Sequence, residues 1–188
     1  QTERLREQVQ HAYRNSPFYR RKLDEAGVRP DHIRTLENVQ RLPLTTKDEL
    51  KQSQIDHPLW GDFLAVPFED CLRVHMTSAT TGRPLAYLDT KDDWYGFYHS
   101  YARALYAFGV RKSDMVMAAF SYGPWIGYWS GFYAAQDIGA LVFPAGGFST
   151  DQRIDALLTY PITVLGCTPS YALFLAEQAA RKGIDLAK

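Results

Sequence analysis

The pattern of apolar and polar positions in the second half of the chain predicts strands that alternate with helices. Short continuous apolar runs are separated by longer segments in which apolar residues recur every three or four positions. The short runs are typical of buried parallel strands, and the longer segments of amphipathic helices. The predicted strands span 115–120, 140–143 and 163–167, and the predicted helices span 125–136, 150–159 and 169–182. This alternation predicts an α/β fold with a layered, mostly parallel sheet and flanking helices.

The first half of the chain predicts short surface helices followed by two strands and a long helix. Ser16 and Pro17 have the types expected at a helix start, and Thr46 with Glu49 has the spacing of a capping box. We expect residues 1–70 to be a helical segment with a loop, packed on an incomplete α/β subdomain of residues 71–188. The predicted helices span 2–14, 16–26 and 91–108, and the predicted strands span 73–76 and 85–88.

The long predicted helix carries a continuous apolar stripe. Its large residues recur with a 4-3-4-3 spacing, which places them on one helix face. A stripe of this kind is more often core packing than a ligand platform, so we predict that it packs. Its members are Trp94, Tyr98, Tyr101, Leu105 and Phe108.

Composition and charge narrow the function classes. The 188 residues are 46% apolar, enough for one sizeable core, and 21 basic residues balance 21 acidic ones. Because the net charge is zero, the chain has no overall electrostatic field that would attract nucleic acid or an anionic membrane. We therefore expect a small polar substrate. Cys71 and Cys167 lie in or beside apolar runs, which favours free thiols in a reducing, cytoplasmic compartment. The histidines show no ligand spacing, so a structural zinc site is unsupported.

Two further features bear on the context of the chain. Residues 115–136 carry no charge and are long enough to span a bilayer, but Gly123-Pro124 interrupts the run, so we predict a buried strand followed by a helix. The chain begins at Gln1 with neither an initiator methionine nor a secretory leader. We therefore expect it to be a piece of a longer protein or a processed product.

The stretch from Thr77 to Pro84 reads TSATTGRP and lies between the two predicted strands. Hydroxyls and backbone N–H groups in such a loop can point inward at an anion, and a guanidinium can grip phosphate oxygens with two hydrogen bonds. The alternative is a polar hairpin turn. The spacings of a Walker loop and of a dinucleotide fingerprint are absent, so the residues alone leave both interpretations open.

The segments that leave the predicted parallel strands are a second candidate site, because ligands of open parallel sheets bind beyond the carboxyl ends of the strands. Tyr122 and Trp125 form an aromatic pair beside flexible glycine turns, which suits a flat apolar group. The alternative is that these aromatics cap the core and the glycines serve turns. The candidate residues here are Tyr122, Gly123, Trp125, Gly146 and Gly147.

The loop TSATTGRP resembles the signature [ST]-S-G-T-T-G-K-P of adenylate-forming enzymes, the acyl-CoA synthetase superfamily. Six of the eight positions match, and the departures are Ala79 for glycine and Arg83 for lysine. Arginine keeps the charge but is planar, so its phosphate contact has a different geometry.

Other phrases resemble the phenylacetate-CoA ligase branch of that superfamily, in order and from about residue 4 to the end. These are SPFYRRKLDEAG at 16–27, LPLTTKDELK at 42–51, Tyr122-Gly123 with Trp125, a Gly-Ala…Pro…Gly-Gly pattern at 139–147, and CTPSYA at 167–172.

The resemblance implies an enzyme that converts a carboxylic acid and ATP to an acyl-adenylate, and then to an acyl-CoA. It implies magnesium as a cofactor, with Thr81 as one contact, and a small aromatic acid, ATP and coenzyme A as partners. Tyr122, Gly123, Trp125, Gly146 and Gly147 would hold the acid, with no nucleic acid or membrane involved. The residues that would hold the polyphosphate are Thr77, Ser78, Thr80, Thr81, Gly82 and Arg83.

The resemblance also implies that this chain is the amino-terminal part of such a ligase, within a nucleotide-binding subdomain. The family's nucleotide-base motifs and adenylation lysine would lie beyond Lys188, so we expect no catalytic residue here and no thioester formation by the chain alone. The remainder of its own chain is then a partner, and a homodimer is one possible arrangement. Two alternatives are an enzyme of the same fold that adenylylates a deazaflavin coenzyme, and a non-catalytic binding module.

Overall fold

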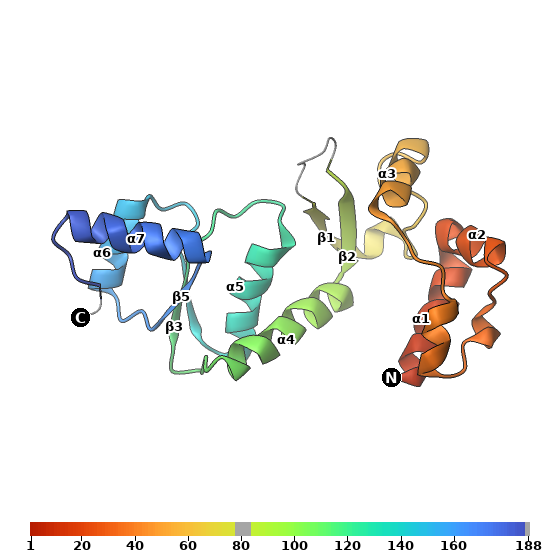
Figure 1. The fold of residues 1–188 in the computed structure, drawn as a ribbon, viewed down its shortest axis with the longest axis horizontal. Coiled ribbons are helices and arrows are strands. Elements are labelled where there is room, and N and C mark those ends of the chain that lie inside the picture. Colours follow the sequence, from red (N-terminus) through yellow and green to blue (C-terminus); the bar gives the residue numbers. More distant parts are fainter. Residues whose placement is uncertain (78–83, 187–188) are drawn as a thin grey trace. The chain divides into compact units, whose positions relative to one another are not determined.

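A computed structural model of the protein describes residues 1–77 and 84–186. The chain divides into two compact units, Gln1–Lys91 and Asp92–Lys188 (Figure 1). The units contain helices together with a three-stranded parallel sheet and a two-stranded antiparallel sheet. The predicted α/β class, with a parallel sheet and flanking helices, is confirmed.

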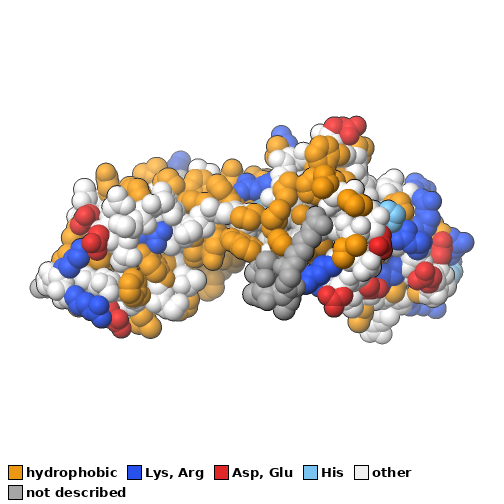
Figure 2. Space-filling model, turned by 90° about the horizontal axis from the view of Figure 1, so that it is seen from above, with side chains coloured by type: hydrophobic (Ala, Val, Ile, Leu, Met, Phe, Trp, Pro, Cys, Tyr) orange, Lys and Arg blue, Asp and Glu red, His pale blue; other side chains and the backbone are white. Residues whose placement is uncertain are grey.

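Unit 1 consists of short helices followed by a β-hairpin. Its core has two groups of buried side chains, one around Ile33 and one around Leu85. Charged side chains gather over its helical end (Figure 2). The helices are α1 (Thr2–Asn15), α2 (Pro17–Glu25) and α3 (Lys47–Asp56), with 3-10 turns η1 (Pro30–His32), η2 (Leu36–Arg41) and η3 (Phe68–Asp70), and the strands are β1 (Cys71–Met76) and β2 (Ala86–Thr90).

The predicted helix starts in unit 1 are confirmed. Ser16 caps α2 by accepting a hydrogen bond from the Tyr19 N–H at 3.3 Å, and Pro17 occupies the first helical position. Thr46 caps α3: its hydroxyl accepts from the Glu49 N–H at 3.3 Å, and the Glu49 carboxylate accepts from the Thr46 N–H at 2.6 Å. Each cap satisfies backbone N–H groups that the first helical turn leaves free.

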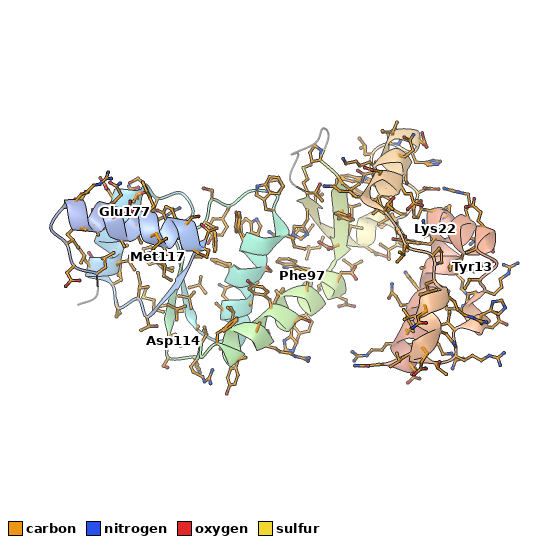
Figure 3. The ribbon with its side chains drawn as sticks, in the orientation of Figure 1. Tyr13, Lys22, Phe97, Asp114, Met117 and Glu177 are labelled. Atoms are coloured by element: carbon orange, nitrogen blue, oxygen red, sulfur yellow. The ribbon has the colours of Figure 1, made fainter. Side chains whose placement is uncertain are left out.

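Glu49 joins this cap to α2, because its carboxylate also pairs with the Lys22 ammonium; Lys22 is labelled in Figure 3. The hydrogen bond from Lys22, followed by those from the Thr46 backbone and hydroxyl, lowers the pKa of Glu49 from 4.5 to about 2. The ionised form of the Glu49 side chain is therefore more stable in the folded state than in the unfolded state.

This shift predicts a pH dependence of stability for the wild type that a Glu49→Gln variant lacks. Because the folded-state pKa lies below the unfolded value, the stabilisation is complete above about pH 4.5 and is lost as the pH falls towards about 2. Urea denaturation across this range should show the free energy of unfolding falling more steeply for the wild type than for the variant. Parallel pH profiles would contradict the pairing.

The β-hairpin packs with the helices of unit 1. β1 and β2 are antiparallel, with His75 opposite Tyr87, and the buried Leu85 packs beside Phe18 and Leu50. The Gln54 side chain of α3 donates to the Ala86 carbonyl at 2.7 Å and accepts from the Ala86 N–H at 3.3 Å. These contacts place the hairpin in the first compact unit, which ends at Lys91, whereas we predicted a division between residues 70 and 71.

Unit 2 contains the parallel sheet with the strand order β4-β3-β5. Met117 of β3 lies opposite Phe143 of β4 and Leu165 of β5. Every predicted strand and helix of this region is present, with bounds that differ by at most a few residues. The elements are α4 (Lys91–Ala107), β3 (Met115–Ala118), α5 (Ile126–Ile138), β4 (Leu141–Pro144), α6 (Thr150–Thr159), β5 (Val164–Gly166) and α7 (Pro169–Arg181).

The sheet of unit 2 has helices on both faces (Figure 1). Val116 faces α4 and α5 and packs with Ala135 of α5. The next residue, Met117, faces the opposite side and packs with Ala156 of α6; it is fully buried and is labelled in Figure 3. Successive side chains of a strand point to opposite faces, so the short apolar strand is covered on both sides.

The aromatic stripe of α4 packs only in part. Trp94 is buried and contacts Tyr98 and Tyr133, as predicted. Tyr101 and Phe108 are 46% and 85% exposed, so the prediction of core packing is wrong for these two positions. Both side chains border a cleft.

The uncharged run 115–136 forms β3 and most of α5. Within the described residues, none of the helices combines the length and the apolar character that crossing a bilayer would require.

Candidate functional site

Thr77 and Leu85 close the base of the predicted phosphate loop. The Thr77 N–H donates to the Leu85 carbonyl at 2.9 Å, and the Thr77 hydroxyl accepts from the Leu85 N–H at 3.1 Å. Leu85 is fully buried, so this pair anchors the ends of the segment to the core of unit 1. The Thr77 hydroxyl keeps its own hydrogen for a further acceptor.

The other residues predicted to bind polyphosphate lie outside the described residues. They are Ser78, Thr80, Thr81, Gly82 and Arg83, and they stay predictions, as does the magnesium contact of Thr81. Among residues 1–77 and 84–186, no group of three or more His, Cys, Asp or Glu side chains is arranged to hold a metal ion.

The carboxyl edge of the parallel sheet brings Tyr122 and Gly146 together. These residues lie in the segments that follow β3 and β4. A Cβ atom placed on Gly146 would lie 2.0 Å from the Tyr122 ring and 2.7 Å from the Phe120 carbonyl oxygen. The Tyr122 ring occupies the space that a side chain at position 146 would need, so only glycine fits there.

Gly123 and Trp125 also lie at this edge, in the segment before α5. The Trp129 indole N–H donates to the Gly123 carbonyl at 2.7 Å, and the Trp129 ring packs on Tyr122 with centroids 4.7 Å apart. Gly147, in contrast, has open space where a Cβ would lie. Tyr122 thus contacts Gly146 and Trp129, and Trp129 is a residue of this edge that we did not predict.

Arg153 of α6 is a buried cation at the same edge. It is 7% exposed, its Nε donates to the Ala145 carbonyl at 3.0 Å, and its Nη2 donates to the Gly146 carbonyl at 3.4 Å. Its guanidinium lies 5.0 Å from the centre of the Tyr171 ring. Sequence patterns gave no sign of this role, because an arginine in the first turns of an amphipathic helix normally faces solvent.

Burial keeps two ionisable groups of this edge neutral. It raises the pKa of the Tyr122 phenol and the pKa of the Cys167 thiol, and the nearby Arg153 charge opposes both shifts without reversing them. Tyr122 is therefore a neutral hydrogen-bonding group near pH 7. Cys167 is a neutral thiol, which is a poor nucleophile. Within residues 1–77 and 84–186, neither Cys71 nor Cys167 forms a disulfide.

An apolar cleft of about 470 Å³ runs along β5 on the side that faces α4 and α5. Phe120, Phe132 and Cys167 line it near the carboxyl edge, and Phe108 lines it near the opposite end. The volume of this cleft and the residues that line it are typical of a binding site for a small apolar group. None of Tyr122, Gly123, Trp125, Gly146 and Gly147 lines the cleft, although Tyr122 lies two residues from Phe120.

Three glycines leave this cleft open. Gly127 and Gly131 lie one turn apart on α5, and Gly166 lies on β5. A Cβ on Gly127 would meet nothing within 4 Å, and one on Gly131 would meet only the Tyr101 ring, at 3.8 Å. Two glycines at this spacing leave a helix face without side chains. The i, i+4 glycine pair was therefore the sequence signal that could have located the cleft.

Taken together, the carboxyl edge offers an apolar cleft, a fixed phenol and a buried cation within one unit. An apolar cleft with a few oriented polar groups is suited to binding an organic acid.

Comparisons with known proteins identify close relatives of this sequence. No family model matches the chain. The phenylacetate-coenzyme A ligase of Thermus thermophilus is 40% identical over 185 residues, which are 98% of this chain and 40% of the relative. That of Escherichia coli K12 is 37% identical over 182 residues, covering 97% of this chain and 40% of the relative.

Solved structures agree with this result. A 2-hydroxyisobutyryl-CoA ligase in complex with 2-HIB-AMP and CoA, in the thioesterification state, matches with a TM-score of 0.90 and 35% identity, covering 97% of this chain and 39% of that chain. The open conformation of this ligase with the same ligands matches with a TM-score of 0.89 and 33% identity, covering 97% of this chain and 40% of that chain. The chain spans about 40% of the length of the curated relatives it matches. Over 97–98% of their length, these 188 residues are similar in sequence to phenylacetate-coenzyme A ligases, and their fold matches that of a solved CoA ligase.

Proposed function

We propose that the full-length protein carrying this chain is an AMP-forming ligase that joins an aromatic carboxylic acid to coenzyme A. The observation that carries this proposal is the similarity to phenylacetate-coenzyme A ligases over 97–98% of the chain, at 36–40% identity. The similarity includes both candidate sites, the loop 77–84 and the carboxyl edge of the sheet. ATP, magnesium and coenzyme A are then the further substrates and cofactor.

The first reaction is attack of the acid's carboxylate on the α-phosphorus of ATP, which releases pyrophosphate and leaves an acyl-adenylate. In the second, the coenzyme A thiol attacks the acyl carbon and AMP leaves. We place the polyphosphate at the loop 77–84, where Thr77, Ser78, Thr80, Thr81 and Gly82 would donate hydrogen bonds and Arg83 would add positive charge. Magnesium supplies charge neutralisation on the phosphates when bound, and Thr81 is the proposed contact for it.

We place the acid at the carboxyl edge of the parallel sheet. The cleft near Phe120, Phe132 and Gly166 would take its apolar body, and burial of that body favours binding. Tyr122 and Trp125, with Gly123, Gly146 and Gly147, would border the acid where the cleft reaches the edge. The neutral Tyr122 phenol supplies orientation and no charge.

A second candidate function is ligation of a small hydroxylated aliphatic acid. It is favoured by the solved ligase that contains 2-HIB-AMP, because that structure matches this chain with a TM-score of 0.90. The two candidates differ in the size of the acid body. The cleft of about 470 Å³ supports the larger, aromatic acid.

The experiment that tests the proposed function follows thioester formation by the full-length protein with ATP, magnesium, coenzyme A and either phenylacetate or 2-hydroxyisobutyrate. We expect turnover with phenylacetate and a lower kcat/KM for the aliphatic acid. The 188-residue chain, which spans about 40% of its relatives, should make no thioester under the same conditions. Ordinary turnover by the short chain, or none by the full-length protein with any acid, would contradict the proposal.

A further inference from the structure

Helix α4 and the residue that follows it carry an exposed apolar row, which we call the α4 stripe. Phe97, Tyr101 and Phe108 are 44%, 46% and 85% exposed; Phe97 is labelled in Figure 3. Ala104, the fourth member, is exposed as well. The Phe108 N–H donates to the Ala104 carbonyl at 3.0 Å, so Phe108 continues the helical turn. Residues three or four positions apart share a helix face, so the four side chains form one row.

The α4 stripe has features of a protein contact surface. The Phe97 ring stacks on the buried Trp94 with centroids 6.2 Å apart, so it needs little further ordering on binding. Ser100 and Ala107 lie beside the stripe and are small and exposed. The Ser100 hydroxyl donates to the Gly96 carbonyl at 2.8 Å, so its hydrogen is satisfied within the helix. Small side chains beside a row of rings allow a second helix to approach closely.

The spacing of the α4 stripe indicates which partner fits it. Its members follow one another at intervals of four, three and four residues, a pattern that reads the same in both directions. Two copies of α4 laid antiparallel about a two-fold axis therefore match stripe to stripe. Phe97 then faces the partner's Phe108, and the Tyr101 ring faces the small Ala104 of the partner. A two-fold interface has this reciprocal form, in which each contact occurs twice.

The charges at the ends of the stripe complement each other in the same arrangement. Asp93 lies four residues before Phe97, in the first turn of α4, and Lys112 lies four residues after Phe108, between α4 and β3. Both side chains are exposed. Antiparallel pairing brings Asp93 of each copy towards Lys112 of the other, whereas parallel pairing would bring like charges together. Charge complementarity of this kind fixes the register and orientation of an interface.

We propose that the α4 stripe is the interface between two copies of the protein, which associate as a two-fold dimer with antiparallel α4 helices. Phe108 also lines the apolar cleft at the end away from the carboxyl edge, so the partner would shield that end from water. Three partly exposed rings per copy cover less than a standard interface of about 1,600 Å², so we expect a weak dimer with a Kd on the order of micromolar. This inference goes beyond the proposed function and does not depend on it.

Sedimentation equilibrium of the full-length protein tests the dimer and its register. Asp93→Lys and Lys112→Asp each place like charges opposite one another twice, so each should raise the Kd of self-association about 10-fold or more. An equal mixture of the two variants should form a mixed dimer about as tight as the wild type, because opposite charges then face each other at both ends. This recovery is specific to pairing of position 93 with position 112.

Matched controls lie on the same helix outside the stripe. Asp92 is also exposed and in the first turn, but on a different face, so Asp92→Lys should leave the Kd unchanged. Phe108→Ala should raise the Kd about 10-fold or more, as is typical of aromatic residues central to an interface. Tyr106 is 55% exposed on another face, and Tyr106→Ala should have no such effect. Both rings are exposed, so neither change should prevent folding.

Three results would overturn the proposal. The first is a full-length protein that stays monomeric at every concentration, as expected if the remainder of its chain covers the stripe. The second is a dimer whose Kd is the same for Phe108→Ala and for the wild type, since another surface would then hold it. The third is a mixture of Asp93→Lys and Lys112→Asp that associates no better than either variant alone.

Discussion

Replacing Gly146 with alanine should strongly impair acid activation by the full-length protein. The added Cβ would lie 2.0 Å and 2.3 Å from two Tyr122 ring carbons and 2.7 Å from the Phe120 backbone oxygen. The ring also packs on Trp129, with centroids 4.7 Å apart, so its displacement would disturb this contact, and the backbone oxygen cannot yield without moving the segment after β3. We expect kcat/KM for the acid to fall about 10-fold to 100-fold, because small misplacements at a binding site have effects of this size.

The neighbouring position gives a matched control for this variant. A Cβ on Gly147 would meet nothing within 4 Å, so Gly147→Ala makes the same chemical change without a clash. The two variants should be compared by kcat and KM for the acid and by KM for ATP. Equal effects of Gly146→Ala and Gly147→Ala would show that the packing of Tyr122 on Gly146 does not position the acid.

Replacing Leu85 with alanine should cause a large loss of stability. Leu85 is fully buried against Phe18 and Leu50, and its backbone closes the loop base with Thr77. Truncating a buried leucine costs about 2–5 kcal/mol, through lost burial and the cavity that remains. Urea denaturation of the purified protein measures this loss directly.

Leu44 provides the control for the leucine experiment, since it is 89% exposed and lies in the same unit. Leu44→Ala should change the free energy of unfolding by less than about 0.5 kcal/mol, which is typical of surface substitutions. If Leu85→Ala were as stable as Leu44→Ala, the hairpin would not be anchored by the core around Leu85. The anchoring of Thr77, and with it the stem of the phosphate loop, would then need another explanation.

The order of strands and helices in unit 2 was predictable because each element follows from local periodicity. The caps at Ser16 and Thr46 were equally predictable, because a capping bond joins residues only three positions apart. The exposure of Phe108 was not predictable. Whether one end of an amphipathic helix is covered depends on residues far away in the sequence, which no local pattern records.

The candidate site shows the same division between local and long-range information. The contact between Tyr122 and Gly146 was predictable in outline, because both residues follow parallel strands that end at one edge. The roles of Trp129 and Arg153 were not, since each depends on which way one side chain of a helix turns. The resemblance to phenylacetate-CoA ligases could be recognised from the sequence because several motifs occur in the same order along the whole chain. A single short motif would not have been sufficient.

The most direct test of the proposed function is acid-dependent exchange of labelled pyrophosphate into ATP by the full-length protein, in the absence of coenzyme A. Exchange requires reversible formation of an acyl-adenylate, so it isolates the step for which we propose the loop 77–84 and the carboxyl edge of the sheet. We predict exchange that depends on both magnesium and an aromatic acid. A folded full-length protein that shows no exchange with any aromatic or hydroxylated acid would contradict the assignment.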